Sequence, residues 1–320
     1  MSEISERIEE GKKQMEETLL RSMQGSNVLE DIGTRLIESG GKRIRPELLM
    51  VSYLAGGGED ITETVPVATA FELIHTASLI HDDITDDPTL RRRRPAPHRR
   101  YGLSRALIAG DFIFAKSFQL LASTNEEVSN VIAEAAMATA EGEYLELMQS
   151  FDATVTREQH EDIMFKKTAA LLTAAAMVGA IMGGMDEEHK AALEVFATNL
   201  GMAFQITDDV LDLEPSAALT GKPSGMDLRE GRMNTVILAA LENLKGGERD
   251  RVIRVFMASS PSTQDVEAAL VLIRSTGAGG IAIKRAQRHV DKALVALESF
   301  DEPIRDYMEA MALEVIRRRS

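Results

Sequence analysis

Residues 71–86 read FELIHTASLIHDDITD, and this stretch indicates the fold class. Ile74, Ser78 and Asp82 are four residues apart, so they lie on one face of a predicted α-helix. The Asp-Asp-x-x-Asp pattern occurs a second time, as DDVLD at 208–212, again after an apolar run. Each copy ends a predicted helix and is followed by a proline-bearing loop. The two copies therefore predict a helical protein with two matched acidic helix ends.

The positions of the prolines favour helices through the middle of the chain. None of the nine prolines lies between His98 and Glu214, a region rich in Ala, Leu, Met and Glu. Turn signals divide this region at 123–125, 150–156 and 183–184. No run of period-two alternation bounded by turn residues predicts a strand. We predict an all-α fold, a single large bundle of about ten to thirteen helices with short connections.

The composition fits one soluble domain over residues 1–320 and excludes several chemistries. The chain has no cysteine, which excludes disulfides, thiolate zinc sites and a cysteine nucleophile and fits a cytoplasmic protein. Its formal charge of −15, from 51 acidic and 36 basic residues, opposes binding to nucleic acid and anionic lipid. The polar start of the sequence is unlike a signal peptide. Residues 169–185 are uncharged but mostly small, so we expect a buried helix and no membrane span.

The aspartate motifs place like charges where a helix disfavours them. Asp82 and Asp86 are four residues apart and repel each other, and the negative end of the helix dipole adds to the cost. A solvated acidic helix end is the alternative, but both motifs follow apolar segments, 77–80 and 201–204. A bound cation reverses both penalties, and oxygen ligands suit Mg²⁺ or Mn²⁺. The candidate metal ligands are Asp82, Asp83, Asp86, Asp208, Asp209 and Asp212.

Basic clusters accompany the acidic motifs in this acidic chain. RRRRPAPHRR at 91–100 holds six arginines directly after the first motif. Arginine binds phosphate oxygens in a bidentate manner while Mg²⁺ binds them from the other side, so a diphosphate ligand is expected. Further basic positions that suit phosphates are GGKRIRP at 40–46, Lys166-Lys167-Thr168, Gly221-Lys222-Pro223 and Arg232. Arg93, Arg94, Arg99 and Arg100 are interpreted as a solvated face. A Walker loop and a GxGxxG motif are both missing, so a nucleotide is not expected.

Six motifs in order resemble one family. They are GGKRIRP, DDITD with Arg91-Arg92, GDF at 110–112, KTA at 167–169, DDVLD preceded by Gln205, and GKPSGMDL at 221–228. Across residues 30–240 the chain resembles the trans-isoprenyl diphosphate synthases, also called polyprenyl synthetases. The resemblance implies an isoprenoid-synthase-type bundle around a deep central cavity, usually a homodimer. It also implies head-to-tail condensation of isopentenyl diphosphate with an allylic diphosphate (dimethylallyl, geranyl, farnesyl or geranylgeranyl), a prenyltransferase reaction.

The resemblance also implies roles for individual residues. Three Mg²⁺ ions would be held by Asp82, Asp86 and Asp208, with Asp83, Asp209 and Asp212 in support. The allylic diphosphate would be held by Arg91, Lys167 and Lys222, with Arg232 nearby. Isopentenyl diphosphate would be held by Lys42, Arg45, His75 and Arg92, and Thr168 and Gln205 would steady the allylic carbocation. The chain departs from the family at Arg93, where glycine is usual, and at 231–236, where GRMNTV replaces the usual GKxTLP.

Product length is implied by the helix before the first motif. Family members that make short products tend to have an aromatic residue one turn before the first aspartate, but Ala77 and Ser78 are small. The next candidate floors are Ile74 and Phe71. One helical turn is about 5.4 Å, close to one isoprene unit, so a product of at least twenty carbons is expected. Long products of this kind would leave through the membrane surface.

Other classes of protein share parts of this pattern. A non-catalytic subunit of a heteromeric prenyl synthase is the main alternative, although such subunits lose aspartates or the arginine pair. A helical HD-type metal phosphohydrolase would use His81-Asp82, but it needs a histidine well upstream, and His75 is the first in the chain. A di-iron bundle needs two Glu-x-x-His motifs, and only Glu72 begins one. A terpene cyclase would lack the site assigned to Lys42 and Arg45.

Overall fold

The computed structural model of the chain describes residues 3–25, 27–91, 94–213 and 224–317. These residues are helical apart from short connections and one hairpin of two strands with two residues each, which confirms the predicted all-α class. They form two compact units. Unit 1 comprises Met1–Ala136, Leu171–Glu194 and Glu298–Met308, and unit 2 comprises Met137–Ala170, Val195–Leu297 and Glu309–Ser320. The organisation as one domain over 1–320 stays a prediction.

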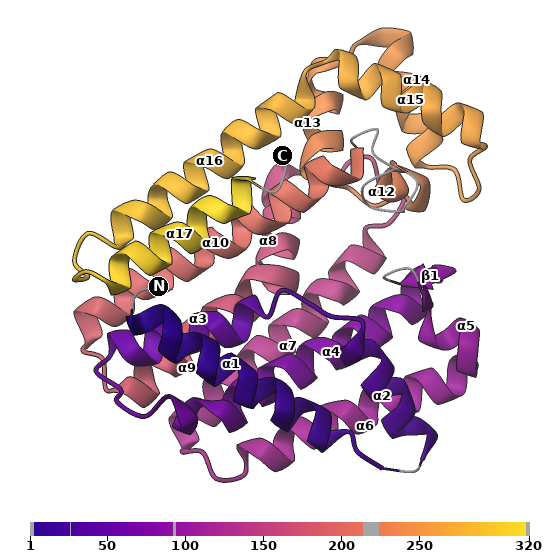
Figure 1. Cartoon of the computed structure of the whole chain (residues 1–320). Coiled ribbons are helices and arrows are strands. Elements are labelled where there is room, and N and C mark those ends of the chain that lie inside the picture. The colour runs from indigo at the N-terminus through magenta and orange to yellow at the C-terminus, as the bar shows by residue number, and fades with distance from the viewer. Residues whose placement is uncertain (1–2, 26, 92–93, 214–223, 318–320) are drawn as a thin grey trace. The chain divides into compact units, whose positions relative to one another are not determined.

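Unit 1 contains the first aspartate motif, at the end of the helix labelled α4 in Figure 1. Its helices are α1 (Glu3–Ser22), α2 (Val28–Glu38), α3 (Ile44–Ala55), the 3₁₀ turn η1 (Ile61–Thr64), α4 (Val65–Asp86), α5 (Pro97–Tyr101) and α6 (Leu103–Leu121). The start of α7 (Glu126–Met148), most of α9 (Ala170–Gly183) and the starts of α10 (Glu187–Leu213) and α17 (Ile304–Arg317) complete it. The hairpin consists of β1 (Leu90–Arg91) and β2 (Arg94–Pro95), which pair antiparallel.

Helix α4 is the centre of unit 1 and carries the motif at its carboxyl end. Pro66 lies in its first turn, where a missing N–H costs nothing, and Asp87 ends it in the left-handed conformation. The helix packs against α1, α3 and α6 (Figure 1). It is apolar on most sides because it is surrounded, and Phe71 and Leu73 are fully buried. The prediction that DDITD ends a helix is confirmed.

The uncharged segment around residues 169–185 forms helix α9. Its glycines allow close packing, because a Cβ added at Gly179 would lie 2.2 Å from the carbonyl oxygen of Leu49 on α3. A continuous helical stretch, Arg157–Gly183, is long and apolar enough to cross a membrane, but 72% of its most apolar window is buried within the protein. Core helices of soluble proteins pass the same test. The predicted buried helix is therefore confirmed.

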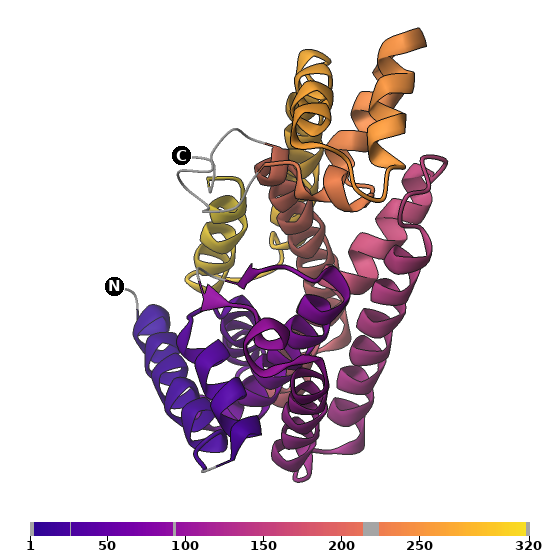
Figure 2. The same ribbon diagram turned by 90° about the vertical axis from the view of Figure 1, so that its right-hand side faces the viewer.

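Unit 2 contains the second aspartate motif, at the end of α10. Besides parts of α7, α10 and α17, it holds α8 (Arg157–Met164), the π-helical turn η2 (Phe165–Ala169), α12 (Met226–Glu230), α13 (Thr235–Asn243), α14 (Gly246–Phe256), α15 (Thr263–Ser275) and α16 (Ala278–Ala296). Helix α13 packs against α15 and α16, and α14 and α15 lie side by side (Figures 1 and 2). Buried side chains of α10, α13, α15 and α16 form one core around Ile206, Ile237 and Leu270.

The structure differs from the sequence prediction in two respects. The described residues hold sixteen α-helices, more than the ten to thirteen expected. Three of them are short, with five residues in α5 and α12 and eight in α8, which is too few for hydrophobic periodicity to reveal. The hairpin was also not expected, because two-residue strands carry no alternation. The turns predicted at 123–125, 150–156 and 183–184 are confirmed.

Candidate active site

The first aspartate motif divides into two half-exposed carboxylates and one buried carboxylate. Asp82 and Asp86 lie on one face of the last turns of α4. Asp83 is completely buried, and its Oδ1 lies 3.2 Å from a guanidinium nitrogen of Arg91. The hairpin that follows the motif brings Arg91 back to α4, and Arg91 faces Arg94 in the hairpin register. Asp83 therefore positions the first arginine of the basic segment in this structure.

Arg45 brings a half-buried cation to the same unit. It lies in the first turn of α3, and its Nε is enclosed and has no hydrogen-bond partner among the described residues. Burial lowers the pKa of the Arg45 guanidinium, while the negative charges of Glu72 and Asp82 act to raise it. An enclosed cation beside the first motif is suited to bind an anion. His75 lies on α4 two turns before Asp82, and Lys42 is exposed just before α3.

Arg43 holds the segment between Lys42 and Arg45. It is buried, it adopts a left-handed conformation with φ of 52°, and its guanidinium contacts Glu16 and Glu72. It also donates a hydrogen bond to the carbonyl of Ile37 at 3.2 Å. A non-glycine residue in this conformation is costly and persists only where its surroundings fix it. Sequence reasoning missed this role, since the GGKRIRP pattern does not show which of its cations faces inward.

A second group of candidate site residues lies in unit 2, around the π turn η2. Lys167 contacts Glu146 and lies 2.6 Å from Glu143, both on α7. Burial alone would lower the pKa of Lys167, but Glu146 and Glu143 raise it well above its usual value. The lysine is therefore charged at neutral pH. Arg232 lies 3.9 Å from Glu146, so this carboxylate faces two cations.

A chain of hydrogen bonds joins the π turn to the second aspartate motif. Thr168 donates to Oε1 of Gln205 at 2.7 Å, and Gln205 donates to Oδ1 of Asp209 at 3.0 Å. The backbone N–H of Thr235 donates to Oδ2 of Asp209 at 2.8 Å, and His160 lies 3.6 Å away. Burial would raise the pKa of Asp209, but His160 and these hydrogen bonds hold it below its usual value. Asp209 is thus ionised, fixed in place and largely satisfied by the protein.

Asp212 and Asp227 are two carboxylates in an environment that disfavours charge. Asp212 accepts hydrogen bonds from the backbone N–H groups of Met226 at 3.0 Å and Asp227 at 3.3 Å, so it caps α12. Burial and the charge of Asp227 raise the pKa of Asp212 to about 8. Burial and the charge of Asp209 likewise raise the pKa of Asp227 to about 6. A cation near this pair would lower both pKa values.

These unit 2 side chains surround a small polar cavity of about 160 Å³. Its lining residues are Glu146, His160, Ile163, Met164, Lys167, Gln205, Asp209, Asp227, Arg232, Met233 and Asn234. The structure therefore brings Lys167, Gln205, Asp209 and Arg232 together. It also adds His160 and Asp227, which sequence reasoning missed. Asp227 stands in the quoted GKPSGMDL motif, so its signal was available, whereas His160 sits in a polar helix with no distinguishing pattern.

Two further predicted residues cannot be placed, and no preformed metal cluster is found. Arg92 and Lys222 lie outside the described residues. Within the described part of the chain, no three His, Asp or Glu side chains are grouped closely enough to hold a metal ion by themselves.

The chain-length candidates Phe71, Ile74 and Ala77 are buried on α4, and Ser78 is half-buried and donates to the carbonyl of His75 at 2.9 Å.

Comparison with known proteins identifies the family. The family model described as polyprenyl synthetase matches residues 26–273. The chain belongs to the polyprenyl synthetase family. A short chain isoprenyl diphosphate synthase from Methanothermobacter thermautotrophicus is 38% identical over 302 residues, 93% of this chain and 88% of that protein. The octaprenyl diphosphate synthase of Escherichia coli is 32% identical over 293 residues, 91% of this chain and 90% of that one.

The fold comparison agrees with the family assignment. A polyprenyl synthase from Caulobacter crescentus superposes with a TM-score of 0.93 at 32% identity, covering 98% of each chain. The predicted isoprenoid-synthase-type fold and the predicted family are confirmed, and the protein is a prenyltransferase of the trans-polyprenyl diphosphate synthase family. The alternatives weighed from the sequence, including the non-catalytic subunit and the HD-type phosphohydrolase, are not favoured.

Proposed function

We propose that this polyprenyl synthetase condenses isopentenyl diphosphate with an allylic diphosphate, using Mg²⁺, to an all-trans product of at least twenty carbons. The observation that carries the proposal is the pairing of acidic motifs with enclosed cations in each unit. Arg45 has an unsatisfied Nε near the charge of Asp82, and Lys167 and Arg232 line the cavity that holds Asp209 and Asp227. Cations beside carboxylates are what a metal-bound diphosphate requires.

The residues of unit 2 are suited to hold the allylic diphosphate. Lys167 is kept charged by Glu143 and Glu146, and it can exchange these partners for phosphate oxygens. Arg232 replaces the lysine that the family usually has, and its fork can bind two oxygens at once. Lys222 and Arg91 are assigned to the same diphosphate. Thr168 and the Gln205 carboxamide form a fixed dipole next to the cations, which suits a role beside the developing allylic carbocation.

The residues of unit 1 are suited to hold isopentenyl diphosphate. Arg45 offers an enclosed donor, and Arg43 fixes the backbone that carries Lys42 and Arg45. His75 and Arg92 are assigned to the same ligand. In the reaction the allylic C–O bond breaks and the diphosphate leaves with its electron pair. The double bond of isopentenyl diphosphate then attacks the carbocation, and a proton is lost to the released diphosphate.

The carboxylates fit a divalent metal. The pKa values of Asp212 and Asp227 are both raised because each is desolvated and lies near another carboxylate, Asp227 and Asp209 respectively, and a cation would relieve this cost. Asp82, Asp86 and Asp208 are each half-buried and are assigned as the main ligands of three Mg²⁺ ions, with Mn²⁺ as a substitute. When bound, the metal supplies Lewis-acid stabilisation of the leaving diphosphate. The Caulobacter crescentus structure was solved in complex with calcium and isoprenyl diphosphate, which supports this assignment.

The product length follows from the helix before Asp82. Ala77 and Ser78 offer no aromatic floor one turn before the motif, so elongation is expected to continue toward Ile74 or Phe71. One turn of helix, about 5.4 Å, corresponds to about one isoprene unit, so we expect about twenty-five to thirty-five carbons. The relatives do not fix this value, because they include a short-chain and an octaprenyl synthase.

We further propose a cytoplasmic homodimer that uses the outer face of α6. Leu103, Leu107, Ile108 and Phe118 on this helix are each about half exposed or more, from 47% to 59%. Four large apolar side chains on one helix are unusual for a free surface and typical of an interface. The absence of cysteine fits a reducing compartment.

The test is a condensation assay with purified protein. Labelled isopentenyl diphosphate and each allylic primer are incubated with Mg²⁺, Mn²⁺ or EDTA, and the dephosphorylated products are separated by chromatography. We expect metal-dependent products of at least twenty carbons, a shorter product from Ala77→Phe, and loss of turnover by orders of magnitude in Asp82→Ala and Asp208→Ala with circular dichroism unchanged. Activity in EDTA, or near-normal turnover of both aspartate variants, would contradict the metal assignment, and a fifteen-carbon product would contradict the length.

A further inference from the structure

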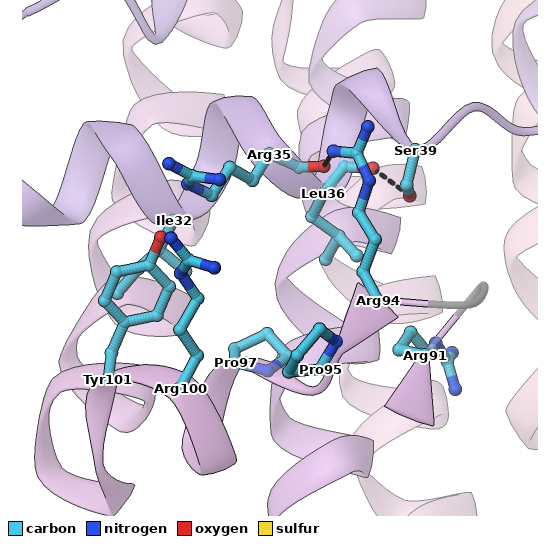
Figure 3. Close-up of a pocket in the computed structure, with 10 residues that line it drawn as sticks. All are labelled: Ile32, Arg35, Leu36, Ser39, Arg91, Arg94, Pro95, Pro97, Arg100 and Tyr101. Atoms are coloured by element: carbon cyan, nitrogen blue, oxygen red, sulfur yellow. Dashed lines mark hydrogen bonds between the residues drawn. The ribbon is translucent and has the colours of Figure 1, made fainter. Parts of the chain in front are cut away.

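Unit 1 contains a second basic pocket, and Arg91 is the only one of its lining residues that is also assigned to the proposed reaction. The pocket lies between α2 and the segment formed by β2 and α5, and it has a volume of about 270 Å³ (Figure 3). Its lining residues are Ile32, Arg35, Leu36, Ser39, Arg91, Arg94, Pro95, Pro97, Arg100 and Tyr101. None of Lys42, Arg45 and His75, which are assigned to isopentenyl diphosphate, is among them. Among the described residues, the pocket therefore shares none of the side chains assigned to isopentenyl diphosphate.

The charge of the pocket is positive after its internal pairs are counted. Arg35 is paired with Asp31, with its Nε 3.0 and 3.1 Å from the two carboxylate oxygens. Arg91 points away from the centre and is paired with Asp83 (Figure 3). For Arg94 and Arg100, the described residues include no carboxylate within ion-pair distance. The charge of Asp31 also acts on Arg100, so this one carboxylate faces both Arg35 and Arg100, and the three arginines Arg35, Arg94 and Arg100 outnumber it.

The surroundings of these arginines are built from separate segments. The Tyr101 hydroxyl donates to Asp31 at 2.6 Å, which holds α5 against α2. Arg100 stacks over the Tyr101 ring at 5.4 Å, and Arg94 donates to the carbonyl of Arg35 at 3.4 Å. Ile32, Leu36 and Pro97 are buried and form an apolar base beneath the guanidinium groups (Figure 3). The predicted solvated positions of Arg94, Arg99 and Arg100 are confirmed, since all three side chains are exposed, and the structure adds an apolar base beneath Arg94 and Arg100.

We propose that this pocket binds a phosphate or diphosphate group through Arg94 and Arg100, with Arg35 as the third cation. Guanidinium groups bind phosphate oxygens in a bidentate manner, and three of them around one concavity suit a dianion. The apolar base accommodates a short hydrocarbon portion of the same ligand. Arg94 on β2 faces Arg91 on β1, so a ligand bound to Arg94 is held next to the strand that carries Arg91. Binding of an anion in the pocket would therefore affect the position of Arg91, the arginine that is assigned to the allylic diphosphate.

The test measures binding of inorganic diphosphate in EDTA by isothermal titration calorimetry. The test variant is Arg94→Gln combined with Arg100→Gln. The matched control is Arg99→Gln, which removes a charge from the same short helix, but at a residue that pairs with Asp87 outside the pocket. We expect the double variant to lose one class of sites, with affinity reduced about tenfold or more, and the control to stay within about twofold of the wild type. Circular dichroism confirms that all three proteins are folded.

An unchanged number and affinity of sites in the double variant would overturn the proposal, as would an equal loss in the control. The readout is binding, so it is independent of whether the protein elongates a prenyl diphosphate. A second arm identifies the source of the phosphate group, using co-sedimentation with vesicles that contain phosphatidic acid. Loss of calorimetric binding with no vesicle binding supports a soluble ligand, and vesicle binding that the double variant loses supports a lipid headgroup. Failure in both arms overturns the proposal.

Discussion

Replacing Arg45 by methionine should make the free protein more stable and the enzyme less active. The Nε of Arg45 is enclosed without a hydrogen-bond partner among the described residues, and an unsatisfied buried donor costs about 1–3 kcal/mol. The charges of Glu72 and Asp82 offset part of this cost. Methionine fills a similar volume without a polar atom, so we expect Arg45→Met to raise the free energy of unfolding by roughly 1 kcal/mol.

The same change should weaken binding of one substrate selectively. A charge-assisted hydrogen bond is worth about 1.5–3 kcal/mol, which corresponds to roughly a ten- to hundredfold rise in the KM for isopentenyl diphosphate. The KM for the allylic diphosphate should stay within about threefold, because Lys167 and Arg232 are assigned to that ligand. Steady-state kinetics with each substrate varied in turn provides the measurement.

Arg43 offers a matched control, because its replacement should change the free energy of unfolding in the opposite direction. Arg43 is buried and is paired with Glu16 and Glu72, whereas Arg45 is half-buried with an unpaired Nε. Replacement of Arg43 by methionine leaves two carboxylates without their cation, and breaking such a pair costs about 3–5 kcal/mol. In urea unfolding of the substrate-free proteins, the midpoint of Arg45→Met should therefore lie above that of the wild type, and the midpoint of Arg43→Met should lie below it. Destabilisation of both variants, or equal KM changes for both substrates, would refute the reasoning.

Three further outcomes are expected. Gly179→Ala should lower the stability by about 3 kcal/mol in urea unfolding, because its Cβ would meet the Leu49 carbonyl at 2.2 Å, whereas Gly280→Ala has open space and should be neutral or stabilising. Burial lowers the pKa of His289 from 6.5 to about 4, so it stays neutral in the folded state; stability is full above pH 6.5 and falls as pH drops toward 4. The wild type should lose roughly 2–3 kcal/mol of its free energy of unfolding over this pH range through His289, and His289→Gln should not. Urea unfolding of both proteins across the pH range measures this, and equal losses would contradict the prediction. Lys167→Met should raise the KM for the allylic diphosphate about tenfold or more with little change for isopentenyl diphosphate, and a balanced loss would argue against its assignment.

The sequence predicted the elements that carry the site better than the contacts within it. Helical periodicity placed Asp82 and Asp86 on one face at a helix end, because the period of an α-helix is fixed by its backbone. It could not show that Asp83 points inward to Arg91, since that depends on a hairpin too short to leave a pattern. The resemblance assigned Asp83 only a supporting role, and the structure adds that Asp83 is buried and lies beside Arg91.

The second motif shows the same limit. Asp209 and Asp212 were predicted as supporting ligands, a role that stays a prediction, and the structure adds that Asp209 is held by Gln205 and Thr235 and that Asp212 caps α12. Asp227 contributes a carboxylate from a segment that lies fourteen or more residues after Asp212 in the sequence. Contacts between distant segments come from packing, which a linear pattern does not encode.

The π turn at Phe165–Ala169 has a consequence for how this gene can change. A π turn holds one residue more than an α-helical turn, so it can be regarded as a single inserted codon that was retained. Deleting one codon there would restore regular α-helix and swing each following side chain by about 100° around the axis relative to α8. Lys167 would then leave the face that meets Glu143 and Glu146. Evolution can therefore substitute residues around Lys167, but it cannot delete one codon there without moving this lysine. We expect alignments of related genes to place their gaps in turns such as 123–125 and not in the π turn.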